Sequence, residues 1–235
     1  MTKDKLVSDF VVERPSRARV FKQFGLDYCC GGRQPLAQAC RELGLDPEAV
    51  FARLLEHDAA SDPEPPDLDG MNLAEVCDEI EKVHHSYLKR ELPRISDLAA
   101  RVVEAHAEAD PRWRDVQAVF ERLRSELESH LWTEEQILFP AIRTLAAAEA
   151  APQFPFGALS NPISVMEAEH DSAGAALAEL RGLTGGYQPP PDACPTTLAL
   201  LDALQTLEAD THRHIHRENN ILHRRALERW RTLQG

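Results

Sequence analysis

Two stretches of this chain repeat the same spacing of histidine and glutamate. The first, HLWTEEQILFP, runs from His130 to Pro140, and the second, HIHRENNILHR, runs from His214 to Arg224. Each places a glutamate four residues after its first histidine, followed by the same Ile-Leu pair. On a helix, positions i and i+4 lie one turn apart on one face, so each stretch presents an imidazole beside a carboxylate. Such pairs are ligands for iron, manganese or zinc.

Four long amphipathic segments after residue 70 predict the helices that position these pairs. The first segment begins at Asn72, an expected N-cap, with Glu75 placed to complete a capping box. Apolar residues recur at spacings of three and four in this segment and in the next, which is expected to end near residue 145. Two further helices are expected near 163–183 and 197–227. The sequence therefore predicts an all-α protein built around a four-helix bundle.

A segment rich in proline and aspartate, HDAASDPEPPDLDG, divides the chain. We expect a small helical domain at 1–57, a linker at 58–70 and the bundle at 71–235. Short helices are expected in the first domain near 16–24, 34–43 and 47–56.

Two adjacent cysteines, Cys29 and Cys30, lie between the first two of these short helices, in the sequence FGLDYCCGG. Adjacent cysteines bond to each other only through a strained ring. We therefore expect free thiols, metal ligands or a redox pair rather than a structural disulfide.

The composition excludes several classes of partner. A net charge of −13 argues against nucleic acid and anionic membranes, which require a basic surface. No stretch approaches the ~20 apolar residues of a membrane-spanning helix, and no apolar run of the signal-peptide type is present near the first residue. Five cysteines without a disulfide-scaffold spacing fit a reducing compartment. We expect a cytoplasmic protein that binds neither nucleic acid nor membrane.

Residue counts place histidines from all four helices near one level of the bundle. At ~1.5 Å per residue, His85 and His130 differ in height by one to two turns, which the loops can absorb. His106 lies ~31 Å from His85 along a continuous helix, so it is expected outside the cluster unless Pro93 breaks that helix. The expected cluster comprises His85, His130, Glu134, His170, His214 and Glu218.

This set of four imidazoles and two carboxylates suits two non-haem iron ions. Each iron would receive two histidines and one oxygen from each bridging glutamate. An oxo bridge would add a fifth bond and leave a sixth position open for a small molecule such as O2 or NO.

A ferritin-like ligand set competes with this interpretation. Such bundles use Glu-x-x-His on two helices and a lone glutamate on each of the other two. The residues for that set are Glu81 with His84, Glu167 with His170, and the lone Glu134 and Glu218. It leaves the repeated His130 and His214 without a role, so the histidine-rich set is favoured.

Several segments resemble the iron–sulfur cluster repair di-iron proteins, the RIC or ScdA/YtfE family, over nearly the whole chain. FGLDYCCGG resembles the signature of that family's N-terminal domain. HHSYLKRELP, HLWTEEQILFP, PISVMEAEHDSAG, PPPDACPTT and HIHRENNIL resemble successive parts of its hemerythrin-like bundle. The resemblance implies a hemerythrin-like four-helix bundle preceded by a small ScdA-type domain. It also implies iron ligands at the six positions of the expected cluster, with His85 chosen over His84.

The function implied by the resemblance is repair of iron–sulfur clusters damaged by nitric oxide or oxidative stress, by iron donation, NO handling or both. The partners implied are NO or O2 and iron–sulfur client proteins, with the chain a monomer or a homodimer. NO-reducing or iron-transfer activity at the di-iron centre is left open. The alternative is a hemerythrin-like protein that binds or senses O2 or NO without repair. The candidate transfer thiols Cys29 and Cys30 disfavour it, because a carrier has no use for them.

The remaining histidines and carboxylates that we consider are expected to lie outside the cluster of six residues. After ENNIL the family usually continues Phe-Pro-Arg-Ala, whereas this chain has His223, which we expect on the surface. His212 and His216 are expected to face away from the cluster, solvated or supporting the ligands. Glu126 and Glu169 are expected to be surface carboxylates, with an access path or a proton relay as the alternative.

Overall fold

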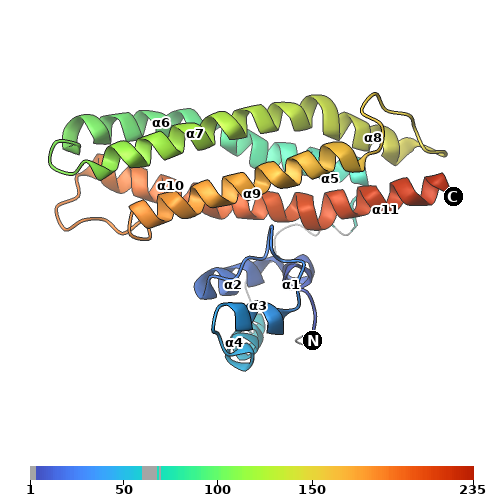
Figure 1. Ribbon diagram of the computed structural model, residues 1–235, viewed down its shortest axis with the longest axis horizontal. Coiled ribbons are helices and arrows are strands. Elements are labelled where there is room, and N and C mark those ends of the chain that lie inside the picture. Colours follow the sequence, from blue (N-terminus) through green and yellow to red (C-terminus); the bar gives the residue numbers. More distant parts are fainter. Residues whose placement is uncertain (1–3, 60–67, 69) are drawn as a thin grey trace.

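The computed structural model describes residues 4–59, 68 and 70–235. Within these ranges the chain is helical, and its only β-pairing consists of two isolated bridges, which confirms the all-α prediction. Figure 1 shows a long four-helix bundle with a small helical unit packed beneath its middle.

The first helix of the bundle is built from three consecutive segments. They are α5 (Leu73–Ile80), the π-helical turn η2 (Glu81–His85) and α6 (Ser86–His106). The predicted capping box is confirmed, since the Asn72 side chain accepts from the Glu75 backbone N–H and the Glu75 side chain accepts from that of Asn72. Pro93 lies inside α6 without ending it.

The other three helices of the bundle follow the predicted order. The second comprises α7 (Arg112–Thr133), the π turn η3 (Glu134–Leu138) and α8 (Phe139–Ala147). The third is α9 (Ser160–Leu183), and the fourth comprises α10 (Pro195–Arg217), the π turn η4 (Glu218–Leu222) and α11 (His223–Gln234). π turns are rare and occur frequently at functional sites, and here three of them lie at residues of the expected cluster.

The core of the bundle is divided into two apolar clusters. One includes Leu88, Leu131 and Ala173, and the other includes Ile80, Leu138, Met166 and Leu222. The histidines and glutamates of the expected cluster lie where one set gives way to the other along each helix, with His130 directly before Leu131. Burying each large apolar side chain stabilises the fold by about 1.5–3 kcal/mol. The two closely packed apolar clusters therefore fix the helices above and below the polar layer.

The N-terminal unit consists of short helices around its own core. These are α1 (Val7–Glu13), the 3₁₀ turn η1 (Pro15–Arg17), α2 (Ala18–Phe24), α3 (Leu36–Glu42) and α4 (Pro47–Ala59). Helix α1 is not among the segments predicted from the sequence. Helix α4 takes in the first two residues of the predicted linker, whose residues 60–67 and 69 lie outside the described residues.

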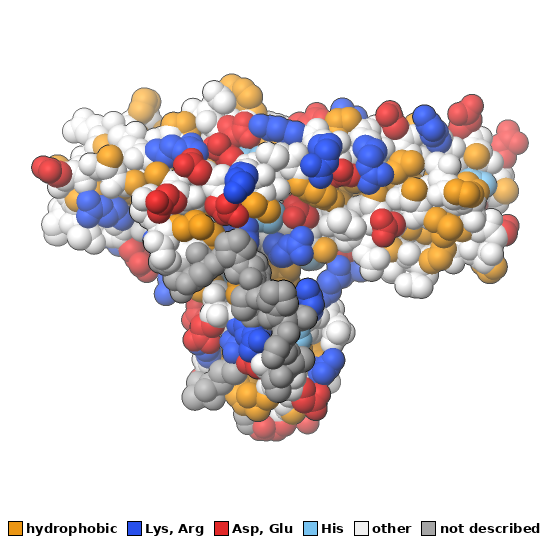
Figure 2. Space-filling model, turned by 180° about the vertical axis from the view of Figure 1, so that it is seen from behind, with side chains coloured by type: hydrophobic (Ala, Val, Ile, Leu, Met, Phe, Trp, Pro, Cys, Tyr) orange, Lys and Arg blue, Asp and Glu red, His pale blue; other side chains and the backbone are white. Residues whose placement is uncertain are grey.

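The N-terminal unit packs directly on the bundle. Ile215 of α10 is buried in the apolar core of the N-terminal unit together with Phe10 and Phe21. Seen from behind in Figure 2, the unit forms the stem of a T whose crossbar is the bundle. No helix in the described part of the chain has the length and apolar character needed to span a membrane.

Candidate metal centre

All six residues of the expected cluster are buried, and they meet in one layer of the bundle. They form two overlapping groups, His85, Glu134, His214 and Glu218, and His130, Glu134, His170 and Glu218. Within each group the ligand atoms lie within 4.8 Å of one another. Because both glutamates belong to both groups, the layer offers two adjacent metal positions that share two carboxylates.

Glu134 lies between two imidazoles. Its Oε2 is 3.4 Å from Nε2 of His85, and its Oε1 is 3.4 Å from Nε2 of His130. Each oxygen of the carboxylate thus faces a different histidine, as a bridging carboxylate must.

Glu218 repeats this arrangement on the opposite side. Its Oε1 lies 2.9 Å from Nε2 of His214, and its Oε2 lies 3.1 Å from Nε2 of His170. The Nε2 atoms of His170 and His130 are 3.0 Å apart. At metal–imidazole distances of about 2.0–2.1 Å, one cation beside these two nitrogens can contact both of them.

The unpaired polar atoms of the layer fit a bound cation. Both oxygens of Glu134 and Nε2 of His85 are buried without a well-formed hydrogen bond, since their nearest partners lie 3.4 Å away. A buried polar group left unpaired costs about 1–3 kcal/mol, and a charged one costs more. Metal ions bound by these atoms remove that cost.

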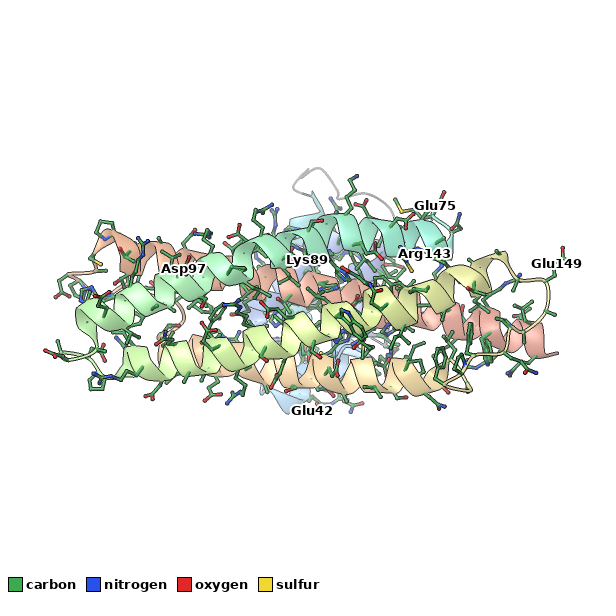
Figure 3. All side chains as sticks on the ribbon, turned by 90° about the horizontal axis from the view of Figure 1, so that it is seen from above. Glu42, Glu75, Lys89, Asp97, Arg143 and Glu149 are labelled. Carbon is green, nitrogen blue, oxygen red and sulfur yellow. The ribbon has the colours of Figure 1, made fainter. Side chains whose placement is uncertain are left out.

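Three of the four imidazoles are oriented from behind by an acceptor on Nδ1. The contacts join His85 to Glu135 at 2.9 Å, His130 to Glu169 at 2.7 Å and His170 to Asn219 at 2.8 Å. In the neutral imidazole such acceptors place the proton on Nδ1, which leaves the Nε2 lone pair facing the layer for a metal. Glu135 also binds Lys89, which Figure 3 shows on α6 on the side of the bundle away from the N-terminal unit.

The charges of the layer are coupled. Burial lowers the pKa of His130, but the carboxylates of Glu134 and Glu218 outweigh it and raise that pKa to about 10. Burial and Glu218 raise the pKa of Glu134, but His130 and His85 outweigh them and lower it to about 2. The metal-free layer therefore holds carboxylates neutralised by imidazolium, and metal binding must release protons.

His84 lies outside the layer, although its neighbour His85 lies in it. Its Nδ1 is 3.1 Å from both oxygens of Asp210, and its Nε2 is 3.1 Å from Nη1 of Arg217. Its ring stacks on that of His214 with 5.2 Å between centroids. His84 therefore supports a residue of the layer and is not itself in either group.

Two carboxylates of the ferritin-like set, Glu81 and Glu167, do not join Glu134 and Glu218 in the layer. Glu81 binds Arg143, the residue labelled on α8 in Figure 3, at 2.9 Å. Glu167 binds Arg33 of the N-terminal unit at 2.6 Å. Neither glutamate belongs to the two groups of the layer.

His223 corrects the sequence prediction. It was expected on the surface, yet it is fully buried with both ring nitrogens unpaired, and its ring lies parallel to that of His170 with 6.2 Å between centroids. The π turn η4 adds a residue to its turn and thereby rotates position 223 toward the interior.

The other peripheral histidines lie at two distant places. His106 Nε2 is 3.2 Å from Sγ of Cys194 at the far end of the bundle, outside the layer as predicted. His216 is buried, not solvated, because the N-terminal unit covers it. His212 is half-buried, with its ring edge-on to that of Tyr28.

A cavity of about 290 Å³ opens beside the layer. Its lining includes His130, His170, Glu126, Glu169 and Thr211. Both glutamates are exposed, as predicted for surface carboxylates, and both also line this cavity.

The adjacent cysteines lie in a loop, residues 27–33, that we call the thiol loop. The carboxylate of Asp27 accepts hydrogen bonds from the backbone N–H groups of Cys29, Cys30 and Gly31 at 2.8–3.1 Å. A Cβ at Gly32 would lie 2.5 Å from the Tyr28 carbonyl oxygen, so only glycine fits there.

The thiols of this loop form a third group of donor atoms. The carboxylate of Asp27 and the sulfurs of Cys29 and Cys30 lie within 4.8 Å of one another. The pKa of Cys29 is raised well above its usual range by Cys30, by burial and by Asp27, so Cys29 is a protonated thiol. The loop borders a cavity of about 450 Å³ whose other walls include α9 and His212.

Comparison with known proteins agrees with this architecture. Residues 78–226 match the hemerythrin HHE cation-binding domain, and residues 3–58 match ScdA_N, a domain of unknown function (DUF542). Proteins of Citrobacter koseri, Escherichia coli and Shigella boydii are each 35% identical to this chain over 225 residues, or 96% of this chain and 97% of theirs. Each is named iron-sulfur cluster repair protein YtfE.

The chain belongs to this family. The HHE match spans the helices that carry the six residues of the layer, and the ScdA_N match spans the thiol loop. Both parts of the predicted resemblance are thereby confirmed, and the hemerythrin-like match identifies the bundle as a cation-binding domain.

Proposed function

We propose that this protein repairs iron–sulfur clusters damaged by nitric oxide or oxidants, using a di-iron centre in the bundle. The observation that carries the proposal is the pair of overlapping donor groups, in which two glutamates are shared by two sets of two histidines. The ligands proposed are His85, His130, Glu134, His170, His214 and Glu218.

The six residues of the layer would hold two iron ions, which an oxo group and the two carboxylates would bridge. The shared carboxylates place negative charge between the metal positions and reduce the repulsion between two cations. The carboxylates and amide on Nδ1 hold the imidazoles in place. Bound iron supplies redox chemistry and a coordination position for NO or O2, and the cavity beside His130 gives access to it.

The thiol loop supplies the second part of the proposal. Thiolates are soft ligands for iron and react reversibly with NO and oxidants. Asp27, Cys29 and Cys30 together can hold an iron ion, with loss of the thiol protons. We assign them the transfer of iron or NO between the bundle and an iron–sulfur client. In this scheme residues 1–57 act as a transfer domain and residues 71–235 hold the metal, in a monomer or homodimer.

A carrier or sensor of O2 or NO without repair activity is the second candidate. The relatives named as repair proteins and the donor group in the thiol loop both disfavour it. The five free cysteines of the described chain support the reducing, cytoplasmic setting predicted from the sequence.

Metal analysis tests the site, and a repair assay tests the function. The purified full chain should contain two irons, and its absorption and Mössbauer spectra should be those of a histidine-rich, oxo-bridged pair. A carboxylate-rich spectrum would contradict the proposed ligands.

The double variant Cys29→Ser, Cys30→Ser separates metal binding from repair. Its iron content and spectrum should equal those of the unmodified chain, because no thiol is a proposed ligand of the layer. It should fail to reactivate an NO-damaged iron–sulfur enzyme such as an aconitase. Reactivation at the normal rate would show that the thiols are structural.

A further inference from the structure

The π turn η4 contacts the metal layer and the thiol loop at once. Its first residue, Glu218, is a shared carboxylate of the layer. Its second residue, Asn219, accepts a hydrogen bond from Nδ1 of His170 at 2.8 Å. These two residues fix η4 to the layer from the inside of the bundle.

The outer side of η4 holds the thiol loop. The Asn220 side chain donates to the carbonyl oxygen of Cys29 at 3.0 Å, and Arg33 donates to the carbonyl oxygen of Asn219 at 2.9 Å. One turn earlier, Nδ1 of His216 donates to the carbonyl oxygen of Tyr28 at 3.1 Å. Successive residues of one turn therefore bind a metal-layer histidine and the backbone of the thiols.

The metal layer and the thiol loop are joined through η4, so neither can shift without affecting the other. Asn219, Asn220 and His216 are all buried, so a hydrogen bond lost by any of them is not replaced by water. The thiol loop is itself held tightly, since Asp27 ties three of its N–H groups and the backbone at Gly32 packs closely on the Tyr28 carbonyl. A shift of the metal-layer residues on one side of η4 therefore moves the whole turn, and with it the thiol loop on the other side.

We propose that η4 couples iron binding in the bundle to docking of the thiol loop, with Asn219, Asn220 and Arg33 as the positioning residues. Iron bound by Glu218 and His170 fixes η4 in the position that holds the loop. The docked loop in turn holds Asn219 where it orients His170. The loop is held while iron is present and is released as iron leaves, which frees Cys29 and Cys30 for a client.

Linkage makes this coupling reciprocal: if iron strengthens docking by some factor, docking strengthens iron binding by the same factor. Two measurements on the full chain therefore test it. The inference rests on the proposed iron site, so iron content is measured first. A chain that binds no iron overturns both proposals, whereas a chain that binds iron without affecting the loop overturns only this one.

The first measurement is amide hydrogen exchange of residues 27–33 in the iron-loaded and the iron-free chain. Exchange should be at least about fivefold slower with iron bound, the lower end of usual coupling. Amides of α4, the helix of the N-terminal unit farthest from the bundle in Figure 1, should exchange equally in both forms. Equal protection of the thiol loop in both forms would overturn the coupling.

The second measurement is the rate at which iron passes from the chain to a chelator. Arg33→Ala should accelerate it about fivefold, and Asn220→Ala should act in the same direction. Arg224→Ala is the matched control, because Arg224 also pairs across the two units, with Asp9 at 3.2 Å, but from α11 and not through η4. The two arginine side chains are similarly exposed, at 53% and 57%. Equal iron release from the Arg33 and Arg224 variants would show that the contact with η4 has no specific effect on the metal, which would overturn the coupling.

Discussion

Glu134 and Glu218 contribute a carboxylate to both donor groups of the metal layer, although 84 residues separate them in the chain. Each follows a histidine by four residues and begins a π turn. The repeated sequence pattern thus becomes a pair of equivalent positions on two helices, and in the proposed site each shared carboxylate serves two metal positions.

Replacement of a shared carboxylate should cost more iron than replacement of a nearby one. In Glu134→Ala or Glu218→Ala, two metal bonds are lost and the two cations are less shielded from each other, so we expect less than half of the normal iron content. Glu81→Ala is the control, since Glu81 binds Arg143 outside the layer and should keep its iron. The iron content of each variant is measured by mass spectrometry, on protein that circular dichroism shows to be folded and helical. Equal losses would favour the ferritin-like ligand set.

Replacement of His223 by phenylalanine should leave the iron content unchanged. His223 belongs to neither donor group, and burial, aided by His170 and opposed by the charge of Glu218, lowers its pKa to about 4, so it is a neutral ring stacked on His170. Phenylalanine keeps the stacking and removes two unpaired buried nitrogens, so thermal stability should be equal or higher by about 1 kcal/mol. A loss of iron in His223→Phe would identify His223 as a ligand.

Cys194 should be the most reactive thiol outside the thiol loop. The Thr197 hydroxyl and then the His106 ring lower its pKa to about 6, whereas burial raises the pKa of Cys77 to about 12. Alkylation of Cys194 by iodoacetamide should rise between pH 5 and 7 and then level off, because the thiolate reacts and is then fully formed. Cys77 should remain unmodified in the native chain.

Peptide mapping by mass spectrometry measures both rates, and His106→Gln should move the rise for Cys194 to higher pH. A Cys194 rate no greater than that of the denatured chain would contradict the assignment.

The N-terminal unit should lose stability in acid through one ion pair. Burial raises the pKa of Asp58, but hydrogen bonds from Arg17 and the charge of Arg14 outweigh it and lower that pKa below its usual value. The folded state therefore binds fewer protons than the unfolded state. The stabilisation is complete above about pH 4 and is lost as the pH falls through the folded-state value.

The variant Asp58→Asn isolates this pair. Asp58 and Arg17 are 2.7 Å apart, with side chains only 15% and 7% exposed, so the loss should be about 1–2 kcal/mol at neutral pH. Unfolding of the variant followed by circular dichroism should then show a weaker dependence on pH between 2 and 4. An unchanged acid transition would mean that other carboxylates control it.

The sequence by itself determined the helices of the bundle and the residues of the layer. Helical periodicity reports which face of each segment is apolar, and the i, i+4 spacing of His130 with Glu134 and of His214 with Glu218 fixes two ligand pairs locally. The single histidines His85 and His170 follow from residue counts along rigid helices of constant rise. These properties depend on neighbours within a turn or on helix length alone.

Only the tertiary structure decided what surrounds the layer. The π turns are invisible to a pattern of period 3.6, and they carry His223 inward, against the surface position expected of it. The family resemblance favoured His85 over His84, and the structure adds the reason: Asp210, from another helix, takes His84 away from the layer. The burial of His216 and the hydrogen bond from Asn220 to Cys29 depend on how two units dock. These hydrogen bonds join residues 188 and 191 positions apart. They depend on the shapes and charges of both surfaces at the interface, and a local sequence spacing does not encode either.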